Sequence, residues 1–364
     1  MRLFLVIAIV VFAALNVIAI GALLHFHPRR RKLVIAVAIV CNLMWFFLPI
    51  LNARTDFSRF VRATLGPPWF AWLCFVLVYA VVALIAFLFR SPWPSRIFLW
   101  ATLIAIPIGV YSALVPLDVE RVPVEIANAP NTKIALIADL HTGLFTRPSR
   151  LRQIFATTAA LGPDVVLLAG DLIDDDPYFT PKLLDALRDF PPDIPVLAVL
   201  GNHENYGAPL EYIARMRGGR VRLLVNEGAP IGPLWIAGIS DYAATLPQLR
   251  PNLARALEGQ RGFPIVVAHQ PKVFDEVLAR HLPLALVAHT HGGQFGFRAL
   301  HWSLAGVFLP YHMGLYRRGA SQIYVNTGTG YWLLPWRIGV VPEITLIELR
   351  SASPHSDSTR SVAR

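Results

Sequence analysis

The N-terminal third of the chain contains four long apolar stretches without a single charged residue. They run over residues 3–24, 33–51, 69–89 and 97–117. A helix of about 20 apolar residues spans the hydrocarbon core of a bilayer. We therefore predict an anchor of about four transmembrane helices over residues 1–117. A large buried helical core is the alternative, but the basic connectors between the stretches favour a membrane.

Most of the positive charge belongs to this anchor. The whole chain of 364 residues carries +10, and the residues before Asp118 include ten basic side chains against one acidic side chain, Asp56. The rest is therefore nearly neutral, which argues against nucleic acid as a partner. The connectors at Arg29–Lys32 and Arg90–Arg96 carry more basic residues than the opposite side, so the positive-inside rule places them in the cytoplasm. We predict a multi-pass protein with its soluble part outside the cytoplasm.

The remainder divides into three parts. Residues 118–132 contain Pro123 and Pro130 and show no strong periodicity, so we predict a linker there. Residues 133–350 are predicted to form one folded domain, and residues 351–364, which are small and polar, a disordered tail. Within the domain, short apolar runs alternate with helix-compatible segments, which predicts an α/β fold with strands buried on both faces.

Five of these apolar runs are followed by Asp, His or Asn residues. A lone Asp after a strand is usually a helix N-cap, and a lone buried His is usually a core residue. Five together predict a ligand site, because loops at the carboxyl ends of strands in open α/β sheets gather at one edge. The residues concerned are Asp139 and His141, Asp171, Asn202 and His203, His269, and His289 and His291.

The types of side chain predict a metal centre. Carboxylates, imidazoles and one carboxamide without a thiolate suit Mn²⁺, Fe or Zn²⁺. Seven ligands suit two divalent ions that share a bridging carboxylate. Two ions about 3.5–4 Å apart can hold a hydroxide and clamp the oxygens of a phosphoryl group. In an extended segment Asp139 and His141 would project to the same side, as would His289 and His291. The seven candidate ligands are Asp139, His141, Asp171, Asn202, His269, His289 and His291.

Several neighbours of these ligands have two possible roles. His203 follows Asn202 directly and is the candidate proton donor to a leaving oxygen. Glu204 either orients His203 or caps the following helix. Gly292 and Gly293 either let the backbone approach the site or form a plain turn. The role of Asp241 stays open.

The order of these motifs resembles the signature of the calcineurin-like metallophosphoesterases over about residues 134–349. The motifs are Asp139-Leu140-His141, Gly170-Asp171, Gly201-Asn202-His203-Glu204, His269 and His289-Thr290-His291. The continuation Gly292-Gly293-Gln294, and Gly328-Thr329-Gly330-Tyr331-Trp332 with Pro335 and Arg337, resemble the YkuE-like branch of membrane-attached bacterial enzymes. Two departures are Ala288, where the family usually has Gly, and Glu204, where Asp is commoner.

The resemblance implies a four-layer α/β/β/α metallophosphoesterase sandwich behind the all-α transmembrane bundle, in the bacterial inner membrane. It also implies a division of the ligands. Asp139, His141 and His291 would hold one metal, Asn202, His269 and His289 the other, Asp171 would bridge, and His203 would assist the leaving group.

The predicted function is therefore metal-dependent hydrolysis of a phosphodiester, monoester or pyrophosphate at or near the membrane. Membrane anchoring favours a substrate at or near the bilayer, such as a lipid-linked phosphate or pyrophosphate, or a cell-envelope polymer. A catalytically silent metal-binding scaffold or sensor is the alternative, but such a protein should have lost a ligand or His203, and all are present. A transporter should carry ionisable residues within its spans, and these four stretches carry none.

Overall fold

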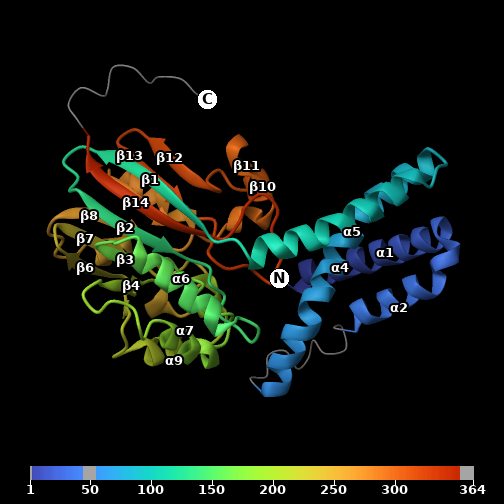
Figure 1. The fold of residues 1–364 in the computed structure, drawn as a ribbon, viewed down its shortest axis with the longest axis horizontal. Coiled ribbons are helices and arrows are strands. Elements are labelled where there is room, and N and C mark those ends of the chain that lie inside the picture. The colour runs from blue at the N-terminus through green and yellow to red at the C-terminus, as the bar shows by residue number, and fades with distance from the viewer. Residues whose placement is uncertain (1, 44–54, 353–364) are drawn as a thin grey trace. The chain divides into compact units, whose positions relative to one another are not determined.

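The computed structural model describes residues 2–43 and 55–352 (Figure 1). The chain divides into a helical unit, residues 1–110 with 333–335, and a second unit, residues 111–332 with 336–364. The boundary falls within the last turns of α5. The helical segments before it are α1 (Arg2–Phe26), η1 (Pro28–Arg30), α2 (Arg31–Asn42), α4 (Asp56–Leu88) and α5 (Trp93–Leu114).

Two of the described helices, α4 and α5, are long and apolar enough to cross a membrane. Residues 10–26 and 28–42 form an apolar helix pair bent by 110°, which is a third candidate if it counts as one broken span. Part of the predicted second span lies outside the described residues, so the count of four stays a prediction. The apolar composition of these helices supports membrane association.

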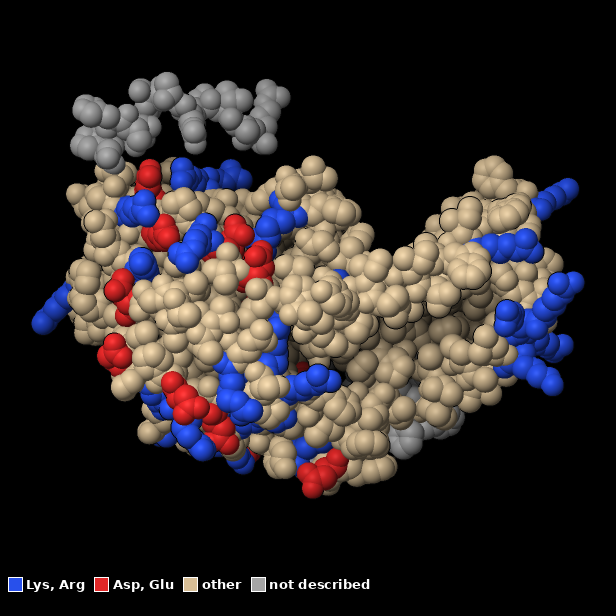
Figure 2. Space-filling view, viewed as in Figure 1, with Lys and Arg blue, Asp and Glu red and all other residues tan. Residues whose placement is uncertain are grey.

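The first and third connectors meet inside the helical unit. His27, which precedes η1, has its Nε2 atom 2.8 Å from Oγ of Ser95 near the start of α5. Ser95 in turn contacts the Tyr79 hydroxyl on α4 at 2.6 Å. Figure 2 shows Lys and Arg side chains gathered at one end of this unit, away from its uncharged body. Such a charge distribution is typical of a transmembrane bundle.

The second unit is built on two six-stranded sheets. The first sheet has the order β1-β14-β2-β3-β4-β5, and the second has the order β12-β13-β9-β8-β7-β6. Strands β2 to β5 run parallel, as do β13, β9, β8 and β7. Their bounds are β1 (Asp118–Ile126), β2 (Thr132–Ile137), β3 (Val165–Leu168), β4 (Val196–Ala198), β5 (Arg222–Leu223), β6 (Glu227–Ile231), β7 (Leu234–Gly238), β8 (Phe263–Val267), β9 (Leu284–Val287), β12 (Gly314–Arg318), β13 (Ser321–Val325) and β14 (Glu343–Ser351).

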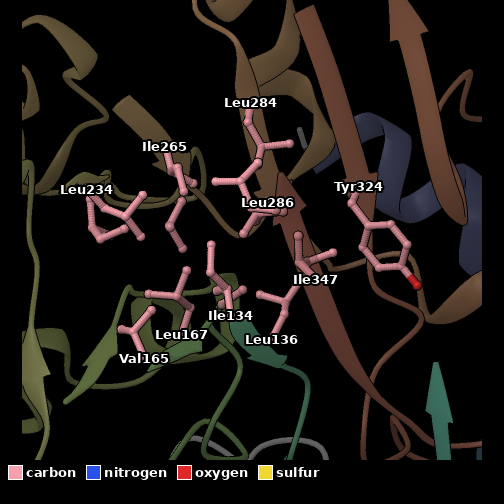
Figure 3. Close-up of a cluster of buried hydrophobic side chains, with 14 of the residues drawn as sticks. Ile134, Leu136, Val165, Leu167, Leu234, Ile265, Leu284, Leu286, Tyr324 and Ile347 are labelled. Atoms are coloured by element: carbon pink, nitrogen blue, oxygen red, sulfur yellow. The ribbon is translucent and has the colours of Figure 1, made fainter. Parts of the chain in front are cut away.

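Three apolar cores hold four layers together. The central core lies between the sheets, where Ile134 and Leu167 of the first sheet face Ile265 and Leu286 of the second (Figure 3). A second core joins the first sheet to its covering helices α6 (Pro148–Ala160), α7 (Thr180–Ala186) and α9 (Pro209–Met216). A third joins the second sheet to α10 (Leu253–Ala256) and α11 (Phe274–Ala279). The predicted α/β/β/α sandwich is confirmed.

The predicted linker over residues 118–132 is wrong. Residues 118–126 form β1, which pairs in parallel with β14 along its whole length. Val122, Val124 and Ile126 are buried in alternation with exposed residues, as a strand with one packed face requires. Pro123 is tolerated because β1 lies at the edge of the sheet. The predicted disordered tail falls almost entirely outside the described residues, after β14 ends at Ser351.

Candidate metal centre

The predicted ligands follow the carboxyl ends of five parallel strands. Asp139 and His141 follow β2, Asp171 follows β3, and Asn202 follows β4 in the first sheet. His269 follows β8, and His289 and His291 follow β9 in the second sheet. Parallel strands bring these loops to the same edge of each sheet, so the seven side chains gather where the two sheets meet.

One group of ligand atoms combines Asp139, His141 and His291, whose donor atoms all lie within 4.8 Å of one another. The two Nε2 atoms of His141 and His291 are 3.1 Å apart. Oδ1 of Asp139 lies 3.5 Å from Nε2 of His291. All three side chains are buried. Two imidazole nitrogens facing each other beside a carboxylate form a donor set for a divalent ion.

A second group combines Asp171, His269 and His289. Nε2 of His269 lies 3.0 Å from Oδ1 of Asn202 and 3.1 Å from Nδ1 of His289. The same Nε2 lies 3.1 Å from Oδ2 of Asp171. The structure thus brings Asn202 into this group.

Asp171, a member of the second group, also lies close to the first group. Its Oδ2 atom is 3.1 Å from Nε2 of His269 and 3.8 Å from Nε2 of His141. Its Oδ1 accepts a hydrogen bond from the backbone N–H of His203 at 2.9 Å, which fixes the orientation of the carboxylate. One carboxylate therefore faces histidines of both groups.

The backbone at the ligands differs from the extended segments predicted for the two pairs. Asp139, His141, His289 and His291 have φ values of 54°, 43°, 76° and 50°, and Asp171 has φ 50°. Residues other than Gly seldom adopt this left-handed backbone conformation, and holding one residue there costs about 1–3 kcal/mol. His289 and His291 point into different groups rather than to one side. Strain of this kind concentrates at functional sites, where the surrounding fold maintains it.

The donor atoms fit a cation. Both carboxylate oxygens of Asp139 are buried and have no hydrogen-bond partner among the described residues. Nδ1 of His269 lies 2.8 Å from the carbonyl oxygen of Ala169 and donates to it, so Nε2 faces the oxygens of Asn202 and Asp171. A metal ion would satisfy the lone pairs of these oxygens and of a deprotonated Nε2, because every one of them is an acceptor.

The pKa values show how closely these groups are coupled. Burial raises the pKa of Asp139 to about 7. Burial alone would raise the pKa of Asp171 too, but the neighbouring histidines hold it far below its usual range. Burial would lower the pKa of His269, but Asp171 and Asp139 raise it to about 10. Burial and the charge of His269 lower the pKa of His289 to about 4. The carboxylate of Asp171 is therefore strongly stabilised by neighbouring positive charge, whereas burial disfavours the carboxylate of Asp139.

His203 lies beside the ligand cluster rather than within either group of three ligands described above. Its Nδ1 is 2.7 Å from Oδ1 of Asp175, and its Nε2 is 3.9 Å from Oδ2 of Asp171. Burial would lower the pKa of His203, but the pairing with Asp175 and the charge of Asp171 raise it to about 9. Asp175 is absent from the predicted site residues. The run Asp174-Asp175-Asp176 after the β3 loop is the sequence signal for it.

Glu204 is a cap: among the described residues, its carboxylate oxygens accept hydrogen bonds from backbone N–H groups and form no ion pair with His203. Oε2 accepts hydrogen bonds from the N–H groups of Gly201 and Asp171 at 2.7 and 3.0 Å. Oε1 accepts from those of Leu172 and Ile173 at 2.7 and 3.1 Å. The carboxylate thus caps the short helix α8 (Asn202–Tyr206) and ties it to the loop that carries Asp171.

Asp241 and Arg337 support the ligands from outside. Oδ1 of Asp241 accepts hydrogen bonds from the Ala243 N–H at 2.7 Å and from Nε2 of Gln270 at 2.9 Å, next to His269. Arg337 is fully buried, donates to the Thr327 carbonyl at 2.8 Å, and places Nη2 3.1 Å from Nδ1 of His291. Arg337 was singled out only through the resemblance, since a lone Arg carries no local signal.

The Gly292-Gly293 pair forms a turn. Both residues have positive φ, 55° and 62°, within η6 (His291–Gln294). Gln294 then fixes the neighbouring loop, because its side chain accepts a hydrogen bond from the Trp332 N–H at 2.9 Å and donates to the Trp332 carbonyl at 3.2 Å. The turn therefore positions the last ligand and one wall of the site together.

Comparison with known proteins agrees with this geometry. A family model described as calcineurin-like phosphoesterase matches residues 132–293, which include all seven predicted ligands. An uncharacterized metallophosphoesterase of Campylobacter jejuni is 32% identical over 250 residues, covering 66% of each chain. A transmembrane protein with a metallophosphoesterase domain from Danio rerio is 30% identical over 264 residues, covering 67% of this chain and 60% of that protein.

The uncharacterized metallophosphoesterase YkuE of Bacillus subtilis is 28% identical over 238 residues, covering 61% of this chain and 80% of that protein. The matches thus span 66% of the length of the Campylobacter jejuni relative and 60% of the length of the Danio rerio relative. The family model, these relatives and the clustered Asp and His side chains all agree on a metal-dependent phosphoesterase. The chain belongs to the calcineurin-like metallophosphoesterase superfamily and to its YkuE-like branch.

Proposed function

We propose that this protein is a two-metal hydrolase of phosphoesters that is anchored in a membrane. The position of Asp171 supports two ions rather than one, since its carboxylate faces His269 at 3.1 Å and His141 at 3.8 Å. A carboxylate has two oxygens and can bridge. The proposed ligands of one ion are Asp139, His141 and His291, those of the other are Asn202, His269 and His289, and Asp171 is shared. The donor set suits Mn²⁺, Fe or Zn²⁺.

When bound, the two ions would supply Lewis acidity for the phosphoryl oxygens and a lowered pKa for water. His203 would act as the proton donor to the leaving group. Its Nδ1 lies 2.7 Å from Oδ1 of Asp175, so the Nε2–H of a protonated ring is left to face the ligand cluster. The leaving oxygen takes this proton as the P–O bond breaks, and neutral imidazole remains. Asp175 stabilises the protonated ring and fixes its orientation.

The substrate and location rest on the chain as a whole. We propose a phosphodiester, monoester or pyrophosphate at or near the membrane, because apolar helices directly precede the phosphoesterase domain. The excess of basic residues in the first and third connectors supports a multi-pass arrangement with this domain outside the cytoplasm. We place the domain at residues 118–351, since β1 and β14 pair along their full length.

The test uses the full chain, purified in mild detergent and loaded with Mn²⁺. Metal content is measured by elemental analysis, and hydrolysis is followed with bis-p-nitrophenyl phosphate and p-nitrophenyl phosphate. We expect two ions per chain and turnover of at least one ester. Asp171→Asn should lose metal and activity together, because it removes the shared charge.

His203→Asn separates catalysis from metal binding. It should keep both ions and slow hydrolysis by about a hundredfold or more, as loss of a general acid does. The decrease should be larger for phenyl phosphate than for p-nitrophenyl phosphate, since the poorer leaving group needs the proton more. A protein that binds two ions and turns over neither ester, nor a pyrophosphate such as a nucleoside diphosphate, would be a silent scaffold.

A further inference from the structure

The exposed apolar side chains of the second unit are concentrated in one segment. Between residues 116 and 352, thirteen large hydrophobic side chains are well exposed, and seven of them belong to residues 295–313. We call residues 295–313 the apolar lobe. Leu300, Val307 and Phe308 are its most exposed members, at 74%, 61% and 80%. A patch of this kind on a folded surface marks an interaction site.

The lobe is an ordered part of the fold. It consists of β10 (Gly296–Phe297), η7 (Arg298–Leu300), β11 (Trp302–Ser303) and η8 (Leu304–Val307). The Leu304 N–H donates to the Phe295 carbonyl at 2.8 Å, and Oγ of Ser303 lies 3.0 Å from Nδ1 of His312. These bonds hold the backbone while the apolar side chains project outward.

The lobe is joined to the metal centre. It begins four residues after ligand His291, and its far end is tied back because Oγ1 of Thr290 donates to the His312 carbonyl at 2.7 Å. Two other exposed aromatic side chains lie beside His203. Tyr206 and Trp332 have ring centroids 5.5 Å and 6.4 Å from that of His203. The metal centre therefore has exposed apolar side chains in its surroundings.

The lobe also lies where the chain leaves its last apolar helix. Nη1 of Arg298 is 3.6 Å from Oε2 of Glu120, the third residue of β1. Glu120 follows Leu114, the end of α5, by six residues, and six residues of chain span at most about 20 Å. Nη2 of Arg150, near the start of α6, donates to the Pro116 carbonyl at 2.6 Å. The covalent chain thus limits the distance between this face and the end of α5.

The charge of the lobe fits a lipid surface. Residues 295–313 include no acidic residue and one basic residue, Arg298, which pairs with Glu343 and Glu120. The exposed surface is left to aliphatic and aromatic side chains, with Trp302 41% exposed. Aromatic and aliphatic side chains on a folded segment next to a membrane anchor are typical of an interfacial contact.

We propose that the apolar lobe inserts into the interfacial layer of the bilayer that holds the anchor, and so opens the metal centre toward lipid headgroups. The occupant of this surface is lipid. The consequence rests on the proposed function: the phosphoester taken up there is an amphiphile that stays in the bilayer during hydrolysis.

Insertion is measured without reference to activity. In the full chain, Cys41 and Cys74 are changed to Ala, and Leu300→Cys is labelled with nitrobenzoxadiazole. The protein is placed in phosphatidylcholine–phosphatidylglycerol vesicles with or without brominated acyl chains. Arg261→Cys is the matched control. Arg261 is exposed and precedes β8, whereas the predicted metal ligands follow the carboxyl ends of the strands.

We expect brominated lipid to quench the label at position 300 at least about fivefold more than the label at position 261. Equal quenching at the two positions overturns the proposal. The proposal is also overturned if the emission at position 300 changes only when labelled chains are diluted with unlabelled chains. That result would identify a second copy of this chain as the occupant.

A second measurement tests the consequence. Leu300→Ser with Phe308→Ser is compared with Leu210→Ser, an exposed side chain on α9 outside the lobe. We expect both to hydrolyse bis-p-nitrophenyl phosphate at the wild-type rate within about twofold, and the lobe variant to lose about tenfold on p-nitrophenyl hexadecyl phosphate in vesicles. Equal rates of the two variants on the long-chain ester contradict the lipid substrate. Quenching without hydrolysis of either ester by the wild type leaves insertion standing and removes the proposed function instead.

Discussion

His203 and Asp175 form a close ion pair, with Nδ1 of the imidazole 2.7 Å from Oδ1 of the carboxylate. The pair lies beside the ligand cluster, since Nε2 of the same ring is 3.9 Å from Oδ2 of Asp171. One nitrogen is therefore occupied by a fixed anion while the other faces the centre. This arrangement stabilises the protonated ring, which is the form that can donate a proton.

Asp175→Asn should move the alkaline limb of the pH–rate profile to lower pH. Burial by itself would lower the pKa of His203, but Asp175 and Asp171 raise it to about 9. Activity needs the protonated ring, so it is present below this pKa and lost as pH rises through it. Removing one nearby anion lowers the pKa by about one unit or more. The profile of kcat for the metal-loaded chain measures the shift.

Asp185→Asn serves as control for this shift, because Asp185 pairs with Arg188 on the exposed face of the domain. Its limb should coincide with that of the wild type. If the Asp175→Asn limb also coincides with the wild type, His203 is not the donor or Asp175 does not set its proton affinity.

Glu204→Gln should destabilise the domain. Four backbone N–H groups donate to the Glu204 carboxylate at 2.7–3.1 Å. An amide offers one acceptor oxygen and turns an NH₂ group toward the remaining donors, which leaves buried polar groups unpaired at about 1–3 kcal/mol each. We expect a clearly lower melting temperature by scanning fluorimetry. Glu211→Gln, on the exposed face of α9, should change it little. Equal melting temperatures for the two variants would show that the cap is dispensable.

The strand ends were predictable because their signals are local. Runs such as Val165–Leu168 are wholly apolar and end in Gly and Asp, so both the strand and the ligand position follow from neighbouring residues. The convergence of five such loops follows from the general behaviour of parallel strands. The confirmed four-layer sandwich came from the family resemblance rather than from any single run.

Features that depend on distant partners were not predictable in the same way. β1 is a strand because it pairs with β14, more than 200 residues later in the chain. Asp175 is identified only by the path of its loop toward His203. The left-handed backbone at His289 and His291 accompanies side chains that enter different groups, against the rule of alternation, and no local pattern predicts it. The strands of the apolar lobe, β10 and β11, are two residues long each, which is too short for a periodic signal.

Gly330→Ala should disturb the ligand Asp139. The Gly330 N–H donates to the Asp139 carbonyl at 3.0 Å, and a Cβ atom at residue 330 would lie 2.5 Å from that oxygen and 2.7 Å from the Leu140 carbonyl. Backbone atoms cannot swing away, so the loop that carries Asp139 must shift. We expect weaker binding of one metal ion and about tenfold or more lower activity, as a displacement of about 1 Å at a reacting centre produces.

Gly219→Ala is the matched control for this substitution. Its added Cβ would meet nothing nearer than the Met216 carbonyl at 3.3 Å, on an exposed turn. Elemental analysis should find two ions in this variant. Full metal content and activity in Gly330→Ala would contradict the role assigned to the close approach.

Metal removal should reverse the order of stability between the wild type and Asp139→Asn. Both oxygens of Asp139 are buried without a hydrogen-bond partner among the described residues, and burial raises its pKa to about 7. With Mn²⁺ at a hundred times its dissociation constant, binding adds about 2.7 kcal/mol to the wild type. With a chelator, the wild type keeps a buried carboxyl whose ionised form is disfavoured by burial, a cost that the amide variant avoids. Melting temperatures should therefore rank the wild type higher in Mn²⁺ and the variant level or higher in chelator. A wild type that exceeds Asp139→Asn by the same margin in both conditions would mean that Asp139 stabilises the fold without holding a metal.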